Sequence, residues 1–195
     1  VQALRELQAS LFAKGREFEH VLKMGRTHLQ DAVPMSLGQE FHGWGTTIGE
    51  EVQRIAEVRE LLKEINLGAT AIGTTVTAHP GYPPLATQYL SDLTGFKFIL
   101  AGDLIEATSD TGAYVLLSGV LKRTSAKLTK ICNDIRLLAS GPRCGFNEIN
   151  LPQMQPGSSI MPGKVNPVIP EVVNQTSFLV IGLDLTVTLA ASAGQ

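Results

Sequence analysis

The sequence has few cysteines, few charged residues and almost no excess of either charge. Its two cysteines in 195 residues, Cys132 and Cys144, cannot form a disulfide framework or a four-ligand zinc site. Reduced thiols are typical of the cytosol or an organelle matrix, and of these we expect a cytoplasmic protein. Charged residues make up 17% of the chain, against about 25% in an average globular chain. We infer that much of this protein's surface is covered by other protein surfaces. The formal net charge of -2 offers no electrostatic footprint for nucleic acid or an anionic membrane.

Long apolar runs are missing too. The most apolar stretch, residues 178–193, is interrupted by Asp184 and is shorter than the roughly 20 residues of a membrane span. We therefore expect a buried helix and no membrane contact. Residues 1–13 lack the apolar core of a signal peptide, and a hydrophobic content of 44% excludes intrinsic disorder. Because the first residue is Val1 and the last residues show no stop signal, we expect a piece of a longer protein.

Apolar side chains recur every three or four residues over most of the sequence, which predicts helices. The predicted helices cover residues 4–22, 37–65, 85–93, 103–140 and 168–193. We expect the first to end near Gly25, and the turn-forming residues of 68–84 and 141–167 to be loops. Without period-two alternation, strands are at most incidental. The pattern predicts an all-α fold, a bundle of long helices whose faces pack against other subunits.

The loop 141–167 contains residues that suit anion binding. Ser158, Ser159, Lys164 and Asn166 lie within nine residues, between glycines and prolines. Exposed backbone amides, an ammonium group and a carboxamide together suit a carboxylate. The alternative is a mobile surface loop made of ordinary turn residues.

A second candidate segment is Gly25-Arg26-Thr27-His28-Leu29-Gln30-Asp31, at the expected exit of the first helix. A histidine beside a hydroxyl can bind an anion or transfer protons. The alternative is a plain polar side chain. Residues 68–79 can line a small polar site or form a simple turn, and Cys132 is expected to be structural because it lies near the apolar side of a helix.

Two of these segments resemble active-site segments of the aspartase/fumarase superfamily. Gly157-Ser158-Ser159-Ile160-Met161-Pro162-Gly163-Lys164-Val165-Asn166-Pro167 is similar to its signature loop, and residues 25–31 resemble another of its segments, in the expected order. The resemblance runs through essentially all 195 residues. It implies an enzyme that cleaves a C–N or C–O bond and releases fumarate, with no cofactor and no metal ligand assigned.

The resemblance also implies the roles of the loop residues. Ser158 matches the base that takes a proton from the carbon next to a carboxylate. A serine can serve as a base only if backbone amides and a cation favour its alkoxide. Lys164 and Asn166 match residues that hold the substrate carboxylate, and Ser159 is assigned to substrate binding with them.

At the other end of the substrate, Thr27 and His28 match residues of the superfamily, and Glu171 matches the acid that pairs with this histidine. Such a pair would fix the protonation of the histidine. The superfamily's enzymes are homotetramers whose active sites combine segments from three subunits. The resemblance therefore implies that Thr27 and His28 meet the Ser158 loop across a subunit interface.

Two branches of the superfamily compete. Val168-Ile169-Pro170-Glu171-Val172-Val173-Asn174-Gln175 favours the branch that releases ammonia from L-aspartate, whereas Arg143-Cys144-Gly145 favours the branch that releases water from malate. We expect the first. Thr75 and Thr77 depart from the superfamily's usual Gly-Thr-Gly-Leu-Asn pattern, which puts substrate contacts at that segment in doubt.

The domain organisation follows from the resemblance as well. Residues 1–195 match most of the superfamily's central helical domain, and its N-terminal and C-terminal domains have no counterpart here. We expect little or no lyase activity from these residues alone. The remaining alternative is a non-catalytic helical oligomerisation scaffold, against which the presence of Ser158, Lys164 and His28 argues.

Overall fold

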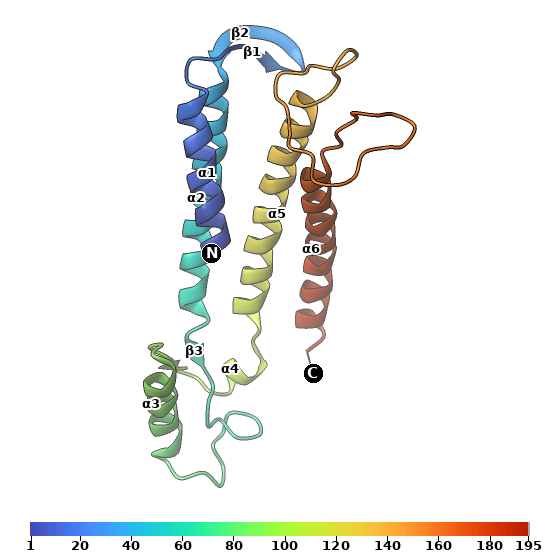
Figure 1. Cartoon of the computed structure of the whole chain (residues 1–195). Helices are drawn as coiled ribbons and strands as arrows, with labels where there is room; N and C mark the ends of the chain where they lie inside the picture. The colour runs from blue at the N-terminus through green and yellow to red at the C-terminus, as the bar shows by residue number, and fades with distance from the viewer. Residues whose placement is uncertain (195) are drawn as a thin grey trace. The chain divides into compact units, whose positions relative to one another are not determined.

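The computed structural model describes residues 1–194, and in them helices dominate (Figure 1). The helices are α1 (Gln2–Glu17), α2 (Leu37–Leu61), α3 (Tyr82–Thr94), α4 (Glu106–Ser109), α5 (Gly112–Leu138) and α6 (Val168–Ser192), and the strands are β1 (Leu22–Thr27), β2 (Gln30–Ser36), β3 (Glu64–Ile65) and β4 (Ile99–Leu100). Two compact units share them: unit 1 holds residues 1–53 and 122–182, and unit 2 holds residues 54–121 and the chain from Leu183 onward. The all-α prediction is confirmed.

The core of unit 1 lies where α1, α2 and α5 meet. Its buried side chains are Leu11, Leu37, Trp44, Ile48, Ile131 and Leu138. On α2, Phe41 packs edge-on against both Phe18 and Trp44, with ring centroids 5.4 and 4.8 Å apart. These α2 positions follow the three- and four-residue spacing that predicts a helix with one buried face.

Glycines on α2 allow α1 to pack closely against it. A Cβ atom at Gly38 would stand 2.3 Å from the carbonyl oxygen of Gly15, and one at Gly45 would stand 2.7 Å from the ring of Phe12. The contact at Gly45 comes earlier in α1 and later in α2 than the contact at Gly38, so the two helices run antiparallel. A larger residue at Gly38 would push the backbones apart.

A buried carboxylate joins α2 to α5 within unit 1. Glu51 is fully buried. Its Oε1 lies 2.7 Å from Nζ of Lys127 and 3.1 Å from Nη2 of Arg123, while the hydroxyl of Thr124 donates to Oε2 at 3.1 Å. A buried charge needs such partners, because desolvation otherwise makes it costly.

Unit 2 contains the short elements. Helix α3 begins with prolines in its first turn and ends at Gly95, which adopts the left-handed conformation with φ of 73° and donates its N–H to Ser91. This confirms the predicted helix at 85–93, and a left-handed glycine is a common way to end a helix. Strands β3 and β4 pair in parallel, and the hydroxyl of Ser118 donates to Asp184 at 2.8 Å. Residues 66–81 form a loop, whereas the last three residues of the loop predicted over 68–84 belong to α3.

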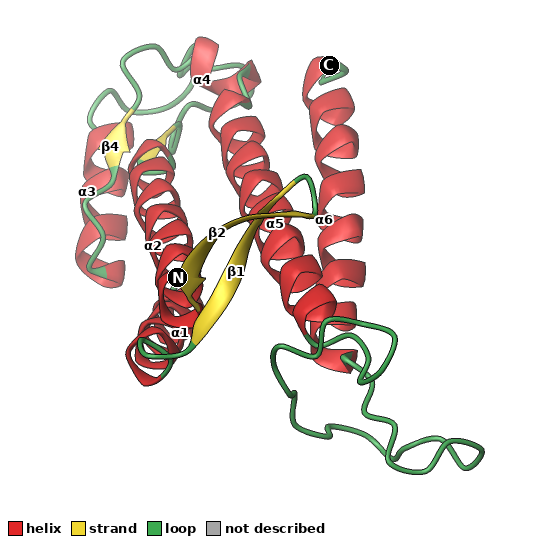
Figure 2. Cartoon of the chain, turned by 90° about the horizontal axis from the view of Figure 1, so that it is seen from above, coloured by secondary structure: helices red, strands yellow, loops and turns green. Residues whose placement is uncertain are grey.

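Two predictions about the N-terminal part of unit 1 are wrong: the extent of the first helix, and the expectation that strands are at most incidental. The first helix ends at Glu17, and residues 22–36 form an antiparallel hairpin, β1 with β2, in place of a helix running to Gly25. The hairpin lies over the end of unit 1 at which α2 begins and α5 ends (Figures 1 and 2). Most of β2 is exposed, so it has no buried face to impose the alternation by which a strand is identified in sequence.

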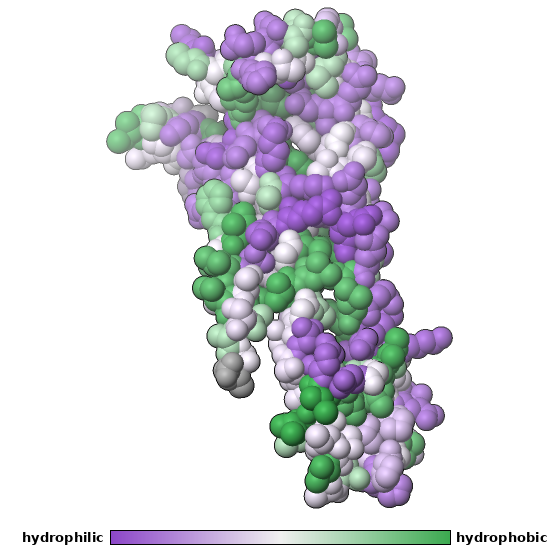
Figure 3. Space-filling view, turned by 180° about the vertical axis from the view of Figure 1, so that it is seen from behind, coloured by the Kyte–Doolittle hydropathy of each residue, from purple (hydrophilic) through white to green (hydrophobic). Residues whose placement is uncertain are grey.

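Helix α6 has the predicted bounds but is not buried on most sides within this chain. Its exposed apolar side chains include Val172, Phe178, Leu179, Leu183, Leu185 and Leu189, and Figure 3 shows hydrophobic side chains gathered on the surface near its C-terminal end. In the described residues it is the one helix long and apolar enough to cross a membrane. A single helix of this kind does not by itself indicate a membrane span, because a core helix of a soluble protein can have the same length and composition.

Candidate active site

The predicted segment at residues 25–31 forms the tip of the β1–β2 hairpin in unit 1. Strand β1 ends at Thr27, β2 begins at Gln30, and His28 and Leu29 make the two-residue turn between them. Both turn residues have positive φ, 54° at His28 and 61° at Leu29, which is the pattern of a type I′ hairpin turn. The turn leaves Thr27 and His28 exposed at the end of the hairpin.

Ion pairs anchor this hairpin on both sides. Lys23 Nζ lies 2.6 Å from Oε2 of Glu40 on α2 and 3.2 Å from Oε2 of Glu148, in the chain that follows α5. Arg26 donates to the other oxygen of Glu148, and its guanidinium lies 4.0 Å from the ring centroid of Phe146. We call Lys23, Arg26, Glu40, Phe146 and Glu148 the hairpin clamp.

Charges within the clamp stabilise one another. Burial is the largest single influence on Glu148 and by itself raises its pKa, but the hydrogen bonds from Arg26 and Lys23 outweigh it, so the pKa of Glu148 lies below its ordinary value of 4.5. The hydrogen bond to Glu148 in turn raises the pKa of Arg26. Both groups therefore stay ionised at neutral pH.

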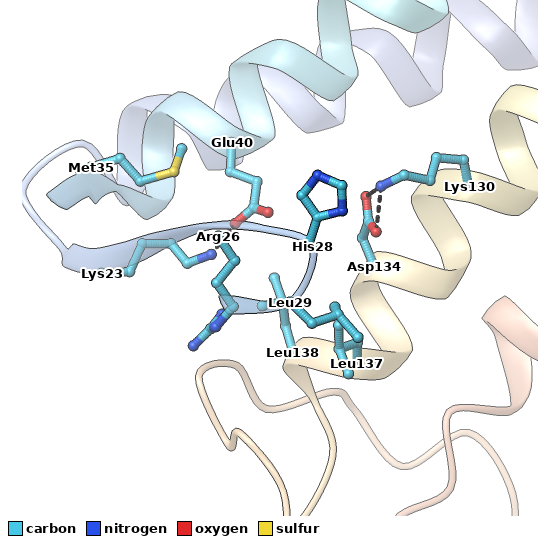
Figure 4. A pocket seen from close by; sticks show the side chains of 10 residues that line it. All are labelled: Lys23, Arg26, His28, Leu29, Met35, Glu40, Lys130, Asp134, Leu137 and Leu138. Carbon is cyan, nitrogen blue, oxygen red and sulfur yellow. Dashed lines mark hydrogen bonds and ion pairs between the residues drawn. The ribbon is translucent and has the colours of Figure 1, made fainter. Parts of the chain in front are cut away.

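A pocket of about 350 Å³ lies beside the turn, within unit 1. Its lining comprises Lys23, Arg26, His28, Leu29, Met35, Glu40, Lys130, Asp134, Leu137 and Leu138 (Figure 4). The His28 imidazole lies on the side facing α5, where Lys130 donates to Asp134 at 2.6 Å. The lining carries three cations, Lys23, Arg26 and Lys130, and two carboxylates, Glu40 and Asp134. Each of these cations is ion-paired with a carboxylate.

The loop 141–167 presents Ser158 with two backbone donors. The N–H groups of Ile160 and Met161 donate to its Oγ at 3.2 and 3.3 Å. Gly163 follows with φ of 79°, a conformation that glycine adopts without strain. Backbone N–H groups that donate to a hydroxyl oxygen favour its ionised form, the alkoxide, which is the form that a serine base needs.

The other predicted site residues lie along the same loop and the start of α6. Ser159 and Lys164 are exposed, and Asn166 is half-buried. Glu171, in the first turn of α6, pairs with Arg136 of α5, with Nη2 and Oε1 3.7 Å apart. In residues 1–194, no hydrogen bond or ion pair joins Glu171, Ser158 or Lys164 to the hairpin tip.

The hairpin and the loop nevertheless belong to the same end of unit 1, where α5 ends and α6 begins (Figures 1 and 2). The clamp joins them, because Phe146 and Glu148 belong to the first part of the loop. Sequence reasoning missed this connection. The sequence shows that Arg26 and Glu148 are charged, but the two residues are 122 positions apart and no spacing rule pairs them.

The loop of unit 2 that departs from the superfamily pattern has an unusual backbone. Thr75 and Thr77 have φ of 56° and 72°. Threonine is β-branched, and β-branched residues are rare at positive φ. Gly73 has φ of 92°, and a Cβ atom there would stand 2.2 Å from the carbonyl oxygen of Leu104. The segment therefore keeps a backbone suited to glycine or asparagine while it holds threonines.

Comparison with known proteins adds family evidence to this geometry. A family model described as lyase matches residues 1–182. Among curated relatives, the aspartate ammonia-lyase of Pseudomonas fluorescens is 63% identical over 99% of this chain. Those of Escherichia coli K12 and Helicobacter pylori 26695 are 60% and 57% identical over 100% of it. The chain spans 41–42% of the length of these bacterial relatives.

Solved structures share the fold. A crystal structure of a fumarate lyase:delta crystallin from Brucella melitensis matches with a TM-score of 0.96 and 56% identity, covering 100% of this chain and 43% of that one. A class II fumarase from Schistosoma mansoni matches with a TM-score of 0.95 and 36% identity, covering 100% of this chain and 44% of that one. Both structures extend well beyond the region matched by these 195 residues.

Proposed function

The chain belongs to the lyase family whose model matches residues 1–182, and from that premise we propose that it forms the central helical domain of an aspartate ammonia-lyase. The reaction is the reversible conversion of L-aspartate to fumarate and ammonia. The observation that carries the proposal is the pair of backbone N–H groups that donate to Ser158 Oγ. The aspartate ammonia-lyases with 57–64% identity over the chain support the choice of substrate.

Ser158 is the proposed base. Its alkoxide takes a proton from Cβ of L-aspartate, the carbon next to the side-chain carboxylate, and the electron pair left on Cβ spreads into that carboxylate. The doubly charged carboxylate that forms is held by Lys164 and Asn166, with Ser159 binding the substrate beside them. Stabilisation of developing charge by fixed donors usually supplies the largest part of catalysis. The electron pair then forms the C=C bond, and the C–N bond breaks with its electrons leaving on the nitrogen.

Thr27 and His28 are proposed to bind the other end of the substrate. Both are exposed at the hairpin tip, where a second subunit can bring its Ser158 loop to them. In this arrangement Glu171 of a neighbouring copy pairs with His28. A homotetramer of this kind would cover the apolar side chains of α6, and L-aspartate would be processed in the cytoplasm. No cofactor enters these steps.

Malate is the alternative substrate. The fumarase match at 36% identity over the whole chain favours it, and so does the segment Arg143-Cys144-Gly145. A fumarase would eliminate water from malate by the same proton abstraction. The two proposals therefore differ in the leaving group and share Ser158 as the base.

One assay tests both. In the native-length protein, the absorbance of fumarate is followed with L-aspartate and then with malate as substrate. We expect fumarate from L-aspartate; fumarate from malate alone would refute the aspartase proposal. Ser158→Ala should lower kcat by at least about 100-fold, with an unchanged circular dichroism spectrum. Ser10→Ala is the matched control, because exposed Ser10 donates its hydroxyl to the carbonyl oxygen of Glu6 within α1, far from the loop in sequence.

A further inference from the structure

The structure assigns a positioning role to Glu148: through Arg26 and Lys23, its carboxylate holds the hairpin tip that carries Thr27 and His28 in its strained conformation. Glu148 does not contact the substrate in this scheme, and it acts through the hairpin. The kinetic part of the inference rests on the proposed function. The structural part concerns unit 1 alone and can be measured without any substrate.

The turn that Glu148 supports is strained. A type I′ turn needs positive φ at both central residues, and Asn-Gly is its usual sequence. Here the residues are His28 and Leu29, with φ of 54° and 61°. Residues with bulky side chains in this region each cost about 1–2 kcal/mol, and such strain persists only where surrounding structure fixes the backbone. The hairpin tip therefore requires an external restraint.

The clamp is that restraint. Lys23 is almost completely buried, with a side-chain exposure of 6%, and lies between Glu40 and Glu148. Arg26 directly precedes Thr27, and it both donates to Glu148 and stacks on Phe146. In the ladder the register shifts at Gly25 and Arg26, so that Arg26 pairs with Asp31 and one residue of β2 bulges out. Bulges re-aim side chains and are frequent beside active sites.

Glu148 can serve as a fixed point because its own backbone is fixed. Its N–H donates to the carbonyl oxygen of Leu138 at 2.9 Å, and the N–H of Asn147 donates to Ser140 at 2.8 Å. The carboxylate is thus tied to the C-terminal end of α5, on the same chain segment that continues to Ser158. A change at Glu148 therefore alters the placement of the hairpin relative to the loop.

Two substitutions and a control test the role in the native-length protein. Glu148→Gln keeps the size and removes the charge, and Glu148→Asp keeps the charge on a shorter side chain. Glu17→Gln removes the carboxylate of an exposed ion pair in the same unit, 2.8 Å from Lys14. Two quantities are measured: kcat/KM for L-aspartate per folded protein, and the hydrogen exchange of backbone amides in residues 22–36.

For Glu148→Gln we expect kcat/KM to fall about 10- to 100-fold, because small displacements of reacting groups have effects of that size. The amides of Arg26 to Gln30 should exchange faster, while those of α2 keep their protection. Glu148→Asp should recover part of both losses, and Glu17→Gln should change neither.

Unchanged exchange at the hairpin in Glu148→Gln would overturn the inference, whether or not the protein has lyase activity. So would faster exchange with kcat/KM within twofold of the wild-type value. If the wild-type protein produces fumarate from neither L-aspartate nor malate, the proposed function fails, and the exchange measurement alone decides whether Glu148 restrains the hairpin tip.

Discussion

Thr75 and Thr77 provide the sharpest test of the link between sequence and backbone in this chain. Both adopt positive φ, 56° and 72°, at positions where the superfamily pattern has glycine and asparagine. The backbone around them is fixed: Thr75 donates its N–H to Ala69 at 3.3 Å and accepts from the N–H of Ala78 at 3.0 Å. The strain therefore cannot relax without loss of these hydrogen bonds. We predict that Thr75→Gly and Thr77→Asn stabilise the protein.

The magnitude follows from two opposing effects. Left-handed backbone costs a non-glycine residue about 1–2 kcal/mol, and glycine removes that cost. Glycine also lowers the free energy of unfolding by about 0.5–1 kcal/mol, because it gives the unfolded chain greater conformational freedom. The net gain for Thr75→Gly is therefore about 0–1.5 kcal/mol. Asparagine tolerates positive φ and keeps a side chain, so we expect a gain of similar size for Thr77→Asn.

Urea denaturation of the single and double variants measures these gains. Thr74 supplies the control, because it is an exposed threonine in the same loop and does not have positive φ. Thr74→Gly should lower the free energy of unfolding by about 0.5–1 kcal/mol. Destabilisation by both Thr75→Gly and Thr74→Gly would refute the reasoning. A lower KM for L-aspartate in Thr77→Asn would further indicate that this loop contacts the substrate.

Three more predictions concern buried and ionised groups. Lys127→Met should lower the free energy of unfolding, followed by urea denaturation, by about 2–3 kcal/mol, because it removes the cation 2.7 Å from fully buried Glu51. Because the pKa of Glu148 is depressed below 4.5 in the folded protein, its contribution to stability is present above that pH and is lost as the pH falls through the folded pKa. As the pH falls below about 4.5, melting temperatures should therefore fall more steeply in the wild type than in Glu148→Gln. Maleimide should label exposed Cys144 at least about 10-fold faster than Cys132, whose burial raises its thiol pKa.

Each of these predictions has a control. Lys14→Met removes one partner of an exposed ion pair, and a loss as large as that of Lys127→Met would contradict the argument from burial. If the melting temperatures of the wild type and Glu148→Gln fell equally with decreasing pH, Glu148 would have an ordinary pKa. In concentrated urea, Cys132 and Cys144 should react at similar rates, and a difference that persisted there would not come from folding.

Most of the long helices could be predicted because their signal is local, but the single helix predicted over 103–140 is wrong, since the structure divides it into α4 (Glu106–Ser109) and α5 (Gly112–Leu138). The steps from Leu37 through Trp44 and Ile48 place apolar side chains on one face, and this face is the buried one. Gly95 ends α3 through a left-handed backbone conformation that does not depend on the rest of the fold. Pro142, which lacks a backbone N–H, follows soon after α5 ends at Leu138. The bounds of α3 and α6 agree with prediction within a few residues.

The hairpin could not be predicted in the same way. Residues 30–34 are exposed on both faces, so burial imposes no alternation on them, and the turn residues His28 and Leu29 are not those that mark a type I′ turn. Pairing with β1 and the restraint of the clamp stabilise this conformation. Both depend on contacts between segments distant in sequence, such as Arg26 with Glu148.

The sequence by itself determined the all-α class, the helix faces and the list of chemically active side chains, because periodicity and residue type are local properties. Only the tertiary structure decided which of these side chains share a neighbourhood: His28 with the ion pair of Lys130 and Asp134, Arg26 with Glu148, and Glu171 with Arg136. The physical reason is that side-chain chemistry is encoded residue by residue, whereas distances between side chains depend on how helices pack and how a strained turn is held.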